Sequence, residues 1–302
     1  MTKAVLAALL AVLSPALACA APQTDAPAVA VVLTTVENMH SGPSADSDVV
    51  SQALLGDNVK VLKTEKNAAG EDWVRVATPD TYEGWVAAKA LRVLEPGARP
   101  YASSGQVFVV SSLLANTYRE TDVTKHKPLK VAPISAVLEL VSEKSERWLE
   151  VVLPCGHHAF VQRGDGDIRE APWTWPRRSV EDMIALAKRF LGLPYTWGGT
   201  SPLGLDCSGF VQLVYKMGGV PILRDADIQM TKSGLLEVPK GQEKPGDLVF
   251  FGRAVDRISH VGMMIEGGLF INATVHERPM VRVDDLREAY WQGIYQAARR
   301  AK

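Results

Sequence analysis

The sequence predicts an α+β protein of three parts, in which two small β-barrels precede a mixed domain of helices and strands. Short stretches of alternating apolar and polar residues, separated by turn residues, run from about 29 to 168, and strands at this density are typical of small barrels. A pair of aromatic residues recurs at the same spacing in each half of that stretch. From 179 onward, apolar residues at helical spacing precede apolar strands, which favours an α+β domain.

The composition is that of a globular protein with a substantial core. A chain of 302 residues is long enough for about two domains, or three small ones, and 47% of it is hydrophobic while 22% is charged. Lys and Arg number 33 against 34 Asp and Glu, so there is no basic surplus to indicate a nucleic-acid partner. Three cysteines are too few for a disulfide scaffold.

Residues 1–20 have the pattern of a secretory signal peptide. An early lysine precedes an unbroken apolar run over 4–13, and an Ala-x-Ala cleavage pattern follows at 18–20. The run is shorter than the roughly 20 apolar residues of a membrane-spanning helix. We therefore expect a secreted, periplasmic protein with no integral membrane segment after signal removal. A lipoprotein anchored through Cys19 is the alternative, because Ala-Leu-Ala-Cys at its position loosely resembles a lipoprotein box.

The repeated aromatic pair indicates one β module used twice. Trp73 and Trp85 lie twelve positions apart, and so do Trp148 and Phe160. Equal spacing of similar residues points to a repeated supersecondary unit. The two modules are expected at 29–97 and 100–168.

The stretch 73–86 reads Trp-Val-Arg-Val, a short loop, and Tyr-Glu-Gly-Trp-Val. It resembles the bacterial SH3-like domains of cell-wall proteins, in which the Gly-Trp-Val strand fills the core. We therefore expect the tryptophans of both modules to pack internally. Tyr82 lies beside this strand on a predicted loop, where a side chain is free to reach a neighbouring domain.

One loop of the second module carries Cys155, His157 and His158. Structural zinc is normally held by four such ligands in paired spacing, and the chain offers no second pair nearby. We therefore expect no metal here, but a solvated loop with one thiol.

The C-terminal domain is expected at 179–302. Its first helix is predicted to begin after Ser179, where Ser-Val-Glu-Asp has the pattern of a capping box. Apolar residues at helical spacing continue to Leu191, and the helix is expected to stop at Gly192.

Cys207 is the candidate nucleophile. Apolar residues at helical spacing follow it, so it is expected at or near the N-terminus of a helix. The free amides and the macrodipole at that end favour the thiolate, which is the reactive form of cysteine. The alternative is a structural cysteine in a disulfide with Cys155.

His260 is the candidate base, since it opens a predicted strand and a thiol nucleophile needs a proton acceptor. A base also needs a third group that holds its ring. If a three-residue loop follows Ile265, the next strand places Asn272 and His276 diagonally on either side of His260, on the same sheet face. The pattern alone does not decide between these two.

Four motifs occur in order along the C-terminal domain: Pro-Tyr-Thr-Trp-Gly-Gly at 194–199, Asp-Cys-Ser-Gly-Phe at 206–210, Pro-Gly-Asp-Leu at 245–248 and His-Val-Gly at 260–262. Over about 180–302 they resemble the NlpC family of papain-like cysteine peptidases. The resemblance implies a papain-like α+β catalytic domain with Cys207 as nucleophile, His260 as base and Asn272 as the orienting residue. Many members have His in that last position, so Asn is a departure of a tolerated type. No cofactor or metal is implied.

Members with two preceding SH3-like modules resemble γ-D-glutamyl-L-diamino acid endopeptidases. These cut peptidoglycan stem peptides after L-Ala-γ-D-Glu and require a free N-terminal L-Ala. The resemblance implies Asp225 as the partner of that ammonium group, Tyr82 as the residue that closes its pocket and Arg224 as a partner of a substrate carboxylate. The other expected substrate-binding residues are Tyr195, Trp197, Asp206 and Ser208.

Two alternatives bear on this pocket. Asp225 also suits the role of N-cap for a helix that follows it. The subgroup carries an acidic residue just before a Gln-Ala-Leu-Leu-Gly stretch, whereas here Val49 and Val50 precede Ser51 and that stretch. One ammonium contact is therefore expected to be absent.

The expected partners are peptidoglycan stem peptides or released muropeptides. Two other functions remain open from the sequence. A non-catalytic wall-binding protein would rely on the SH3-like modules, but the intact Cys/His/Asn set argues against it. An acyltransferase or amidase of the same fold would act on another substrate, and Tyr82 and Asp225 argue against that.

Overall fold

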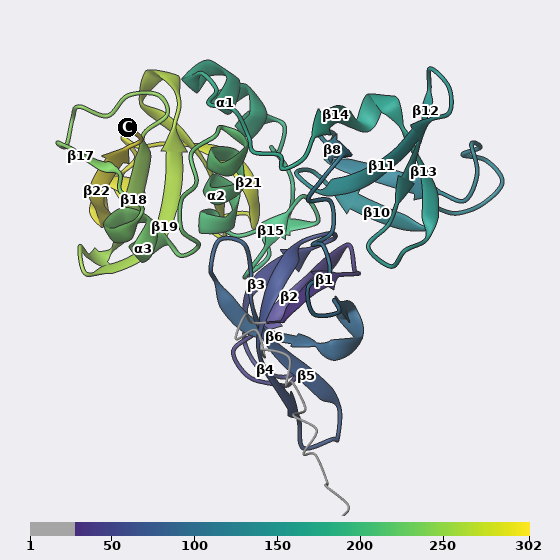
Figure 1. The fold of residues 1–302 in the computed structure, drawn as a ribbon. Helices are drawn as coiled ribbons and strands as arrows, with labels where there is room; N and C mark the ends of the chain where they lie inside the picture. The colour runs from purple at the N-terminus through teal and green to yellow at the C-terminus, as the bar shows by residue number, and fades with distance from the viewer. Residues whose placement is uncertain (1–27) are drawn as a thin grey trace, which may run out of the picture.

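The computed structural model describes residues 28–302 (Figure 1). The predicted signal peptide at 1–20, including Cys19, lies outside the described residues. The C-terminal domain and the second module lie side by side, and the first module lies below the junction between them (Figure 1). The predicted α+β class, with two small barrels before the mixed domain, is confirmed.

All seven strands of the first module contribute to one core. The strands are β1 (Val29–Val32), β2 (Val36–His40), β3 (Val49–Leu54), β4 (Asn58–Lys66), β5 (Asp72–Ala77), β6 (Glu83–Ala87) and β7 (Leu91–Val93). They are hydrogen bonded in the order β3-β2-β6-β5-β4-β1-β7. Apolar side chains from every strand meet inside, from Ala30 on β1 to Leu91 on β7. Trp73 and Trp85 are buried, as predicted.

The second module repeats this topology strand for strand. Its strands are β8 (Gln106–Val110), β9 (Leu114–Tyr118), β10 (Lys130–Pro133), β11 (Val137–Glu143), β12 (Trp148–Val152), β13 (His158–Gln162) and β14 (Gly166–Glu170). Their order is β10-β9-β13-β12-β11-β8-β14, which is the first order with each number raised by seven. The inference of one unit used twice is therefore confirmed. Trp148 is buried, as predicted.

The C-terminal domain is a six-stranded sheet with helices on both faces. The helices are α1 (Val180–Lys188), α2 (Cys207–Met217), α3 (Ala226–Lys232) and α4 (Ala289–Ile294). The strands are β15 (Thr200–Ser201), β16 (Gly204–Leu205), β17 (Leu236–Val238), β18 (Leu248–Ala254), β19 (Arg257–Met264), β20 (Leu269–Thr274), β21 (Met280–Asp285) and β22 (Tyr295–Arg300). The main sheet has the order β17-β22-β18-β19-β20-β21.

Alternation along β18 divides the apolar residues of this domain between the two faces. Leu248 and Phe250 pack with α1 and α2, whereas Val249 and Phe251 pack with Trp291 of α4. Such period-two alternation is what a strand buried on both sides requires. The Ser179 hydroxyl accepts a hydrogen bond from the Asp182 amide and caps α1, as predicted.

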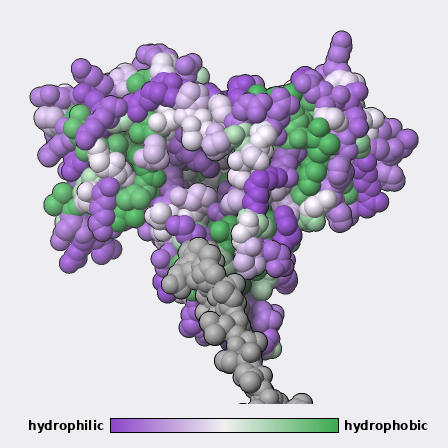
Figure 2. Space-filling view, viewed as in Figure 1, coloured by the Kyte–Doolittle hydropathy of each residue, from purple (hydrophilic) through white to green (hydrophobic). Residues whose placement is uncertain are grey.

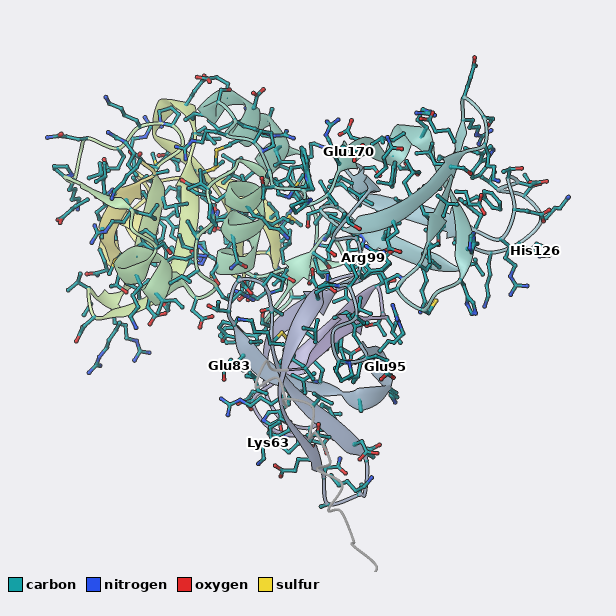
Figure 3. All side chains as sticks on the ribbon, in the orientation of Figure 1. Lys63, Glu83, Glu95, Arg99, His126 and Glu170 are labelled. Carbon is teal, nitrogen blue, oxygen red and sulfur yellow. The ribbon has the colours of Figure 1, made fainter. Side chains whose placement is uncertain are left out.

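The first module contacts both neighbours. Arg99, in the linker between the two modules and labelled in Figure 3, forms a 2.6 Å ion pair with Glu139 of the second module. Leu55 enters the core of the second module. On the other side, the Thr200 amide donates to Gln52 Oε1 at 2.9 Å. The first module therefore contacts the second module through Leu55 and the C-terminal domain through Gln52.

Hydrophilic residues cover most of the face shown in Figure 2, and apolar residues form separate patches on it. Within residues 28–302, no helix is long and apolar enough to cross a membrane.

Candidate active site

Cys207 is the first residue of α2, which confirms the predicted position at a helix N-terminus. Asp206 caps the helix, because its Oδ1 accepts a hydrogen bond from the Gly209 amide at 2.7 Å. Cys155 is exposed and Cys207 is buried, and both are free thiols in the described chain. The alternative of a disulfide between these two cysteines is therefore wrong.

Burial opposes ionisation of the Cys207 thiol. Burial, and then the neighbouring Asp206 carboxylate, raise the pKa of Cys207 to about 12, although the Val261 amide and the Arg224 guanidinium act to lower it. The helix N-terminus was expected to favour the thiolate, and burial opposes that charge more than the nearby donors favour it. A base must remove this proton before the sulfur can attack.

His260 lies on β19, against which α2 packs. The strand begins at Arg257, three residues earlier than expected. The amide of Val261, the residue after His260, is placed to hydrogen bond to the sulfur of Cys207. Burial lowers the pKa of His260 to about 4, so its ring is neutral at neutral pH and able to accept a proton.

The hairpin that carries the third group has the predicted register. A three-residue turn joins β19 and β20, and Met263 pairs with Ile271 and Met264 with Phe270. Asn272 is fully buried, and its Oδ1 lies 2.8 Å from Nε2 of His260. The structure thus brings His260 and Asn272 together.

His276, the alternative third group, points elsewhere. Its ring is stacked on Tyr290, with 3.8 Å between the ring centroids and 3° between the planes. The ring of His260 instead lies stacked on Trp291 at 5.4 Å. This geometry favours Asn272 over His276 as the partner of His260.

A cavity of about 530 Å³ opens in front of Cys207. It lies between the C-terminal domain and the first module, because both contribute to its wall. Six of the seven predicted substrate-binding residues line it: Tyr82, Tyr195, Trp197, Asp206, Ser208 and Asp225. Trp197 is the most open of these, with 70% of its surface exposed.

Tyr82 and Asp225 meet across the boundary between these two parts. Burial, followed by the charge of Asp225, raises the pKa of the Tyr82 hydroxyl to about 12. Burial also raises the pKa of Asp225, while Arg224 and then the Tyr82 hydroxyl act to lower it. Asp225 occupies the N-cap position of α3, yet its side chain serves Tyr82 and leaves the first turn of α3 uncapped. The helix-cap alternative therefore does not account for its carboxylate.

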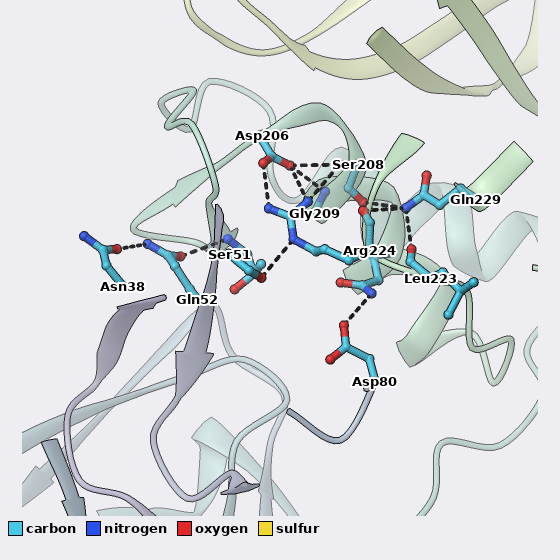
Figure 4. A network of polar contacts seen from close by, with 12 residues as sticks. Asn38, Ser51, Gln52, Asp80, Asp206, Ser208, Gly209, Leu223, Arg224 and Gln229 are labelled. Atoms are coloured by element: carbon cyan, nitrogen blue, oxygen red, sulfur yellow. Dashed lines mark hydrogen bonds and ion pairs between the residues drawn. The ribbon is translucent and has the colours of Figure 1, made fainter. Parts of the chain in front are cut away.

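The structure does not support the predicted role of Arg224 as a partner of a substrate carboxylate. Its side chain is 2% exposed and lies outside the wall of the cavity. Figure 4 shows its guanidinium in four hydrogen bonds: Nη2 and Nη1 to the two Asp206 oxygens at 2.6 and 3.0 Å, Nη1 to Ser208 at 2.8 Å and Nε to Ser51 at 3.1 Å. Four of the five N–H donors of the guanidinium are engaged inside the protein, and the buried side chain does not face the cavity in which a substrate carboxylate would lie.

Asp48 is a cavity residue that the sequence reasoning missed. Along β3, Ser51 pairs with Met39 but Val49 pairs with His40, so Val50 is an extra residue in a β-bulge. A bulge re-aims the residues that precede it. An acidic side chain therefore lines the cavity close to the Gln-Ala-Leu-Leu-Gly stretch, from the far side of the bulge.

Comparisons with known proteins agree with this architecture. The family model described as the NlpC/P60 family matches residues 192–300, and that of the bacterial SH3 domain matches 33–92. The gamma-D-glutamyl-L-lysine dipeptidyl-peptidase of Bacillus cereus is 33% identical over 260 residues, which cover 83% of this chain and 74% of that protein. The enzyme with the same name from Bacillus subtilis is 31% identical, over 77% of this chain and 74% of that protein.

Among solved structures, an NlpC/P60 family protein from Bacillus cereus superimposes with a TM-score of 0.77 at 27% identity. The match covers 90% of this chain and 99% of that one. Both SH3-like modules and the C-terminal domain therefore fall within the region of similarity.

Proposed function

Because the chain belongs to the NlpC/P60 family of cysteine peptidases, we propose that it cleaves the γ-D-Glu–L-diamino acid bond of peptidoglycan stem peptides and requires a free N-terminal L-Ala. Its relatives are named for removing a dipeptide at a γ-D-glutamyl bond. The observation that carries the proposal is the shared cavity, in which Cys207 of α2 and Tyr82 of the first module face the same space.

In the proposed reaction, Cys207 is the nucleophile and His260 the base. Nε2 of His260 is occupied by Asn272, which leaves Nδ1 to take the proton from Sγ. The sulfur attacks the γ-carbonyl carbon, His260 returns its proton to the leaving amine, and the C–N bond breaks to give a thioester. Water then attacks the thioester with His260 again as base, and Cys207 is regenerated.

The amine requirement rests on the carboxylates in the wall of the cavity. Asp225 and Asp48 line it together with the Tyr82 hydroxyl. A substrate ammonium placed there would form charge-assisted hydrogen bonds, which are stronger than neutral ones. An N-acylated peptide would place an uncharged amide against these carboxylates and leave them unpaired.

The test compares L-Ala-γ-D-Glu-meso-diaminopimelate with its N-acetylated form, by mass spectrometry of the products. We expect hydrolysis of the free-amine peptide alone, and none with Cys207→Ala. Equal hydrolysis of both peptides would support the peptidase activity and contradict the requirement for a free amine. Hydrolysis of neither would contradict the proposal and favour a wall-binding role for the modules.

Variants of the pocket sharpen this test. Asp225→Asn removes the charge at nearly constant shape, and Tyr82→Phe removes the hydroxyl. Since a hydrogen bond to a charged group contributes about 1.5–3 kcal/mol, Asp225→Asn should raise KM for the free-amine peptide by about 10- to 100-fold. Asp227→Asn, in the same cavity wall, is the matched control for a general loss of negative charge.

We further propose that the protein acts outside the cytoplasm, in the periplasm. Support comes from the signal-peptide pattern at 1–20. Fractionation of cells that express the full chain, with N-terminal sequencing of the product, tests this. Cleavage after Ala20 is expected, whereas a lipid-modified Cys19 would show the anchored alternative.

A further inference from the structure

We propose that Asp284 is a positioning residue for His260, acting through Asn272. This inference rests on the proposed roles of Cys207 and His260. Asp284 lies on β21, one strand beyond Asn272 and two beyond His260. It contacts neither the cavity nor Cys207, so any effect on the reaction passes through the amide of Asn272.

The side-chain hydrogen bonds form an unbroken line behind the base. His260 Nε2 lies 2.8 Å from Asn272 Oδ1, and Asn272 Nδ2 donates to Asp284 Oδ2 at 2.8 Å. Both residues behind the ring are buried, Asn272 completely and Asp284 with 3% exposed. Arg282 forms a 2.6 Å ion pair with the other Asp284 oxygen, which supplies the cation that a buried carboxylate requires.

Asp284 determines which end of the Asn272 amide faces the histidine. A carboxylate only accepts hydrogen bonds, so the amide must turn its NH₂ group toward Asp284 and its oxygen toward His260. The backbone carbonyl of Arg282, at 3.4 Å from Nδ2, is a second acceptor that favours the same orientation. An Asn without these acceptors could turn either end to the ring.

The orientation of the amide in turn selects the tautomer of His260. Facing an oxygen, Nε2 must carry the proton, and Nδ1 is then the unprotonated nitrogen. Only an unprotonated Nδ1 can accept the proton of Cys207.

The charge of Asp284 also reaches the ring. It raises the pKa of His260, against the larger lowering by burial. The other groups that act on His260 are the Asn272 amide and Asp206, which raise the pKa, and His276, which lowers it. Cys207 approaches from α2 at the neighbouring Val261.

The test compares Asp284→Asn and Asp284→Ala with wild type on the free-amine peptide. Asp284→Asn keeps an acceptor for Asn272 and loses the charge, so kcat should fall by roughly tenfold, while Asp284→Ala loses both and should lose about 100-fold. KM should stay unchanged in both, because the substrate cavity is untouched. Asp285→Asn, the next residue on β21 and paired with exposed Arg287, is the control for charge removal.

The tautomer itself is read from ¹⁵N shifts of the histidine rings, of which the chain has six. Wild type and Asp284→Asn should show a protonated Nε2 on His260, and Asp284→Ala a mixture of tautomers. A folded Asp284→Ala protein with wild-type kcat and a wholly Nε2-protonated His260 would overturn the proposal. If the alanine variant does not fold, an Asp284→Asn protein with unchanged kcat and an unchanged acid limb of the pH profile overturns it.

The two proposals fail in different ways. If wild type and Cys207→Ala are equally inactive, the proposed function fails and the tautomer readout still tests Asp284. If wild type is active and the Asp284 variants match it, only the positioning role is lost.

Discussion

The guanidinium of Arg224 donates to the Ser51 hydroxyl at 3.1 Å and so connects the C-terminal domain, which carries Cys207, to strand β3 of the first module. The same group holds both oxygens of Asp206, the cap of α2. One buried cation therefore holds Asp206, which both caps α2 and lies beside the Cys207 thiol, and contacts the first module through Ser51. The first module is therefore held against the C-terminal domain, next to the cavity that Cys207 lines.

Arg224→Met should destabilise the protein by about 3–5 kcal/mol, because it leaves the Asp206 carboxylate buried without its cation. Urea unfolding followed by tryptophan fluorescence measures this. The double variant Arg224→Met/Asp206→Asn removes the stranded charge and should recover much of the loss. A single variant as stable as wild type would show that the pair does not hold this junction.

Activity should decrease as the pH is lowered, because His260 becomes protonated. The pKa of His260 is lowered to about 4, so the base is available above that pH and lost below it. We expect kcat/KM for the free-amine peptide to rise through about pH 4 and to be level from about pH 5 to pH 7. The unfolding free energy should also decline as pH falls from about 6.5 toward 4, since the unfolded histidine binds its proton first.

The pH dependence of the rate at which iodoacetamide alkylates Cys207 distinguishes a neutral thiol from a thiolate that is already paired with a protonated His260. With the pKa of Cys207 raised to about 12, the thiolate fraction, and with it the alkylation rate, should rise about tenfold per pH unit between roughly pH 6 and 9. The measurement uses Cys155→Ala protein, so that the exposed second thiol does not react. A rate that is already constant above about pH 5 would contradict the neutral resting state.

Cys207→Ala should abolish hydrolysis and leave the fold intact, because Cys207 is a single small side chain at the edge of the core. Cys155→Ala is the matched control: it is also a free thiol but is exposed on a loop of the second module. Full activity in the control and none in Cys207→Ala are expected, with circular dichroism spectra that overlay. Activity retained in Cys207→Ala would remove the thioester mechanism.

The register of the β19–β20 hairpin was predictable because it depends on local sequence alone. Glu-Gly-Gly after Ile265 suits a three-residue turn, and the turn length determines which residues pair. From that pairing, Asn272 follows as a diagonal neighbour of His260. The choice against His276 was not local, since it depends on stacking with Tyr290, a residue of α4.

Asp284 could have been found by extending the same argument. On β20 and β21, Phe270 pairs with Asp284 and Asn272 with Arg282, so Asp284 is diagonal to Asn272 as Asn272 is to His260. The signal is weaker because five residues, 275–279, connect these strands, and the sequence does not show where the connection begins and ends.

Arg224 and Asp48 were misjudged for non-local reasons. Nothing in the sequence around Arg224 shows that Asp206, eighteen positions earlier, fills its guanidinium. Asp48 is displaced by the bulge at Val50, and a bulge breaks the alternation from which side-chain direction is deduced. Both errors concern residues near the contact between the first module and α2. The pattern of a strand indicates which side chains are buried, but not which domain buries them.

Gly198→Ala should disturb that contact and lower both stability and activity. Gly198 has a φ of +74°, and a Cβ there would lie 2.7 Å from Cγ1 of Val49, a residue of the first module that also lines the cavity. Gly192→Ala is the matched control, since Gly192 has a φ of +85° and its Cβ would meet open space among the described residues. Both variants bear the cost of a left-handed backbone, about 1–2 kcal/mol, whereas only Gly198→Ala pushes the two parts apart.

We therefore expect Gly198→Ala to unfold at lower urea concentration than Gly192→Ala and to show a raised KM, while KM in Gly192→Ala stays at the wild-type value. Adding Val49→Ala to Gly198→Ala removes the methyl groups that clash and should restore part of the loss. Because the clash requires the first module to lie against the Gly-Gly turn, rescue by Val49→Ala reports that contact in solution. Equal stability and KM in the two glycine variants would show that the first module does not rest there.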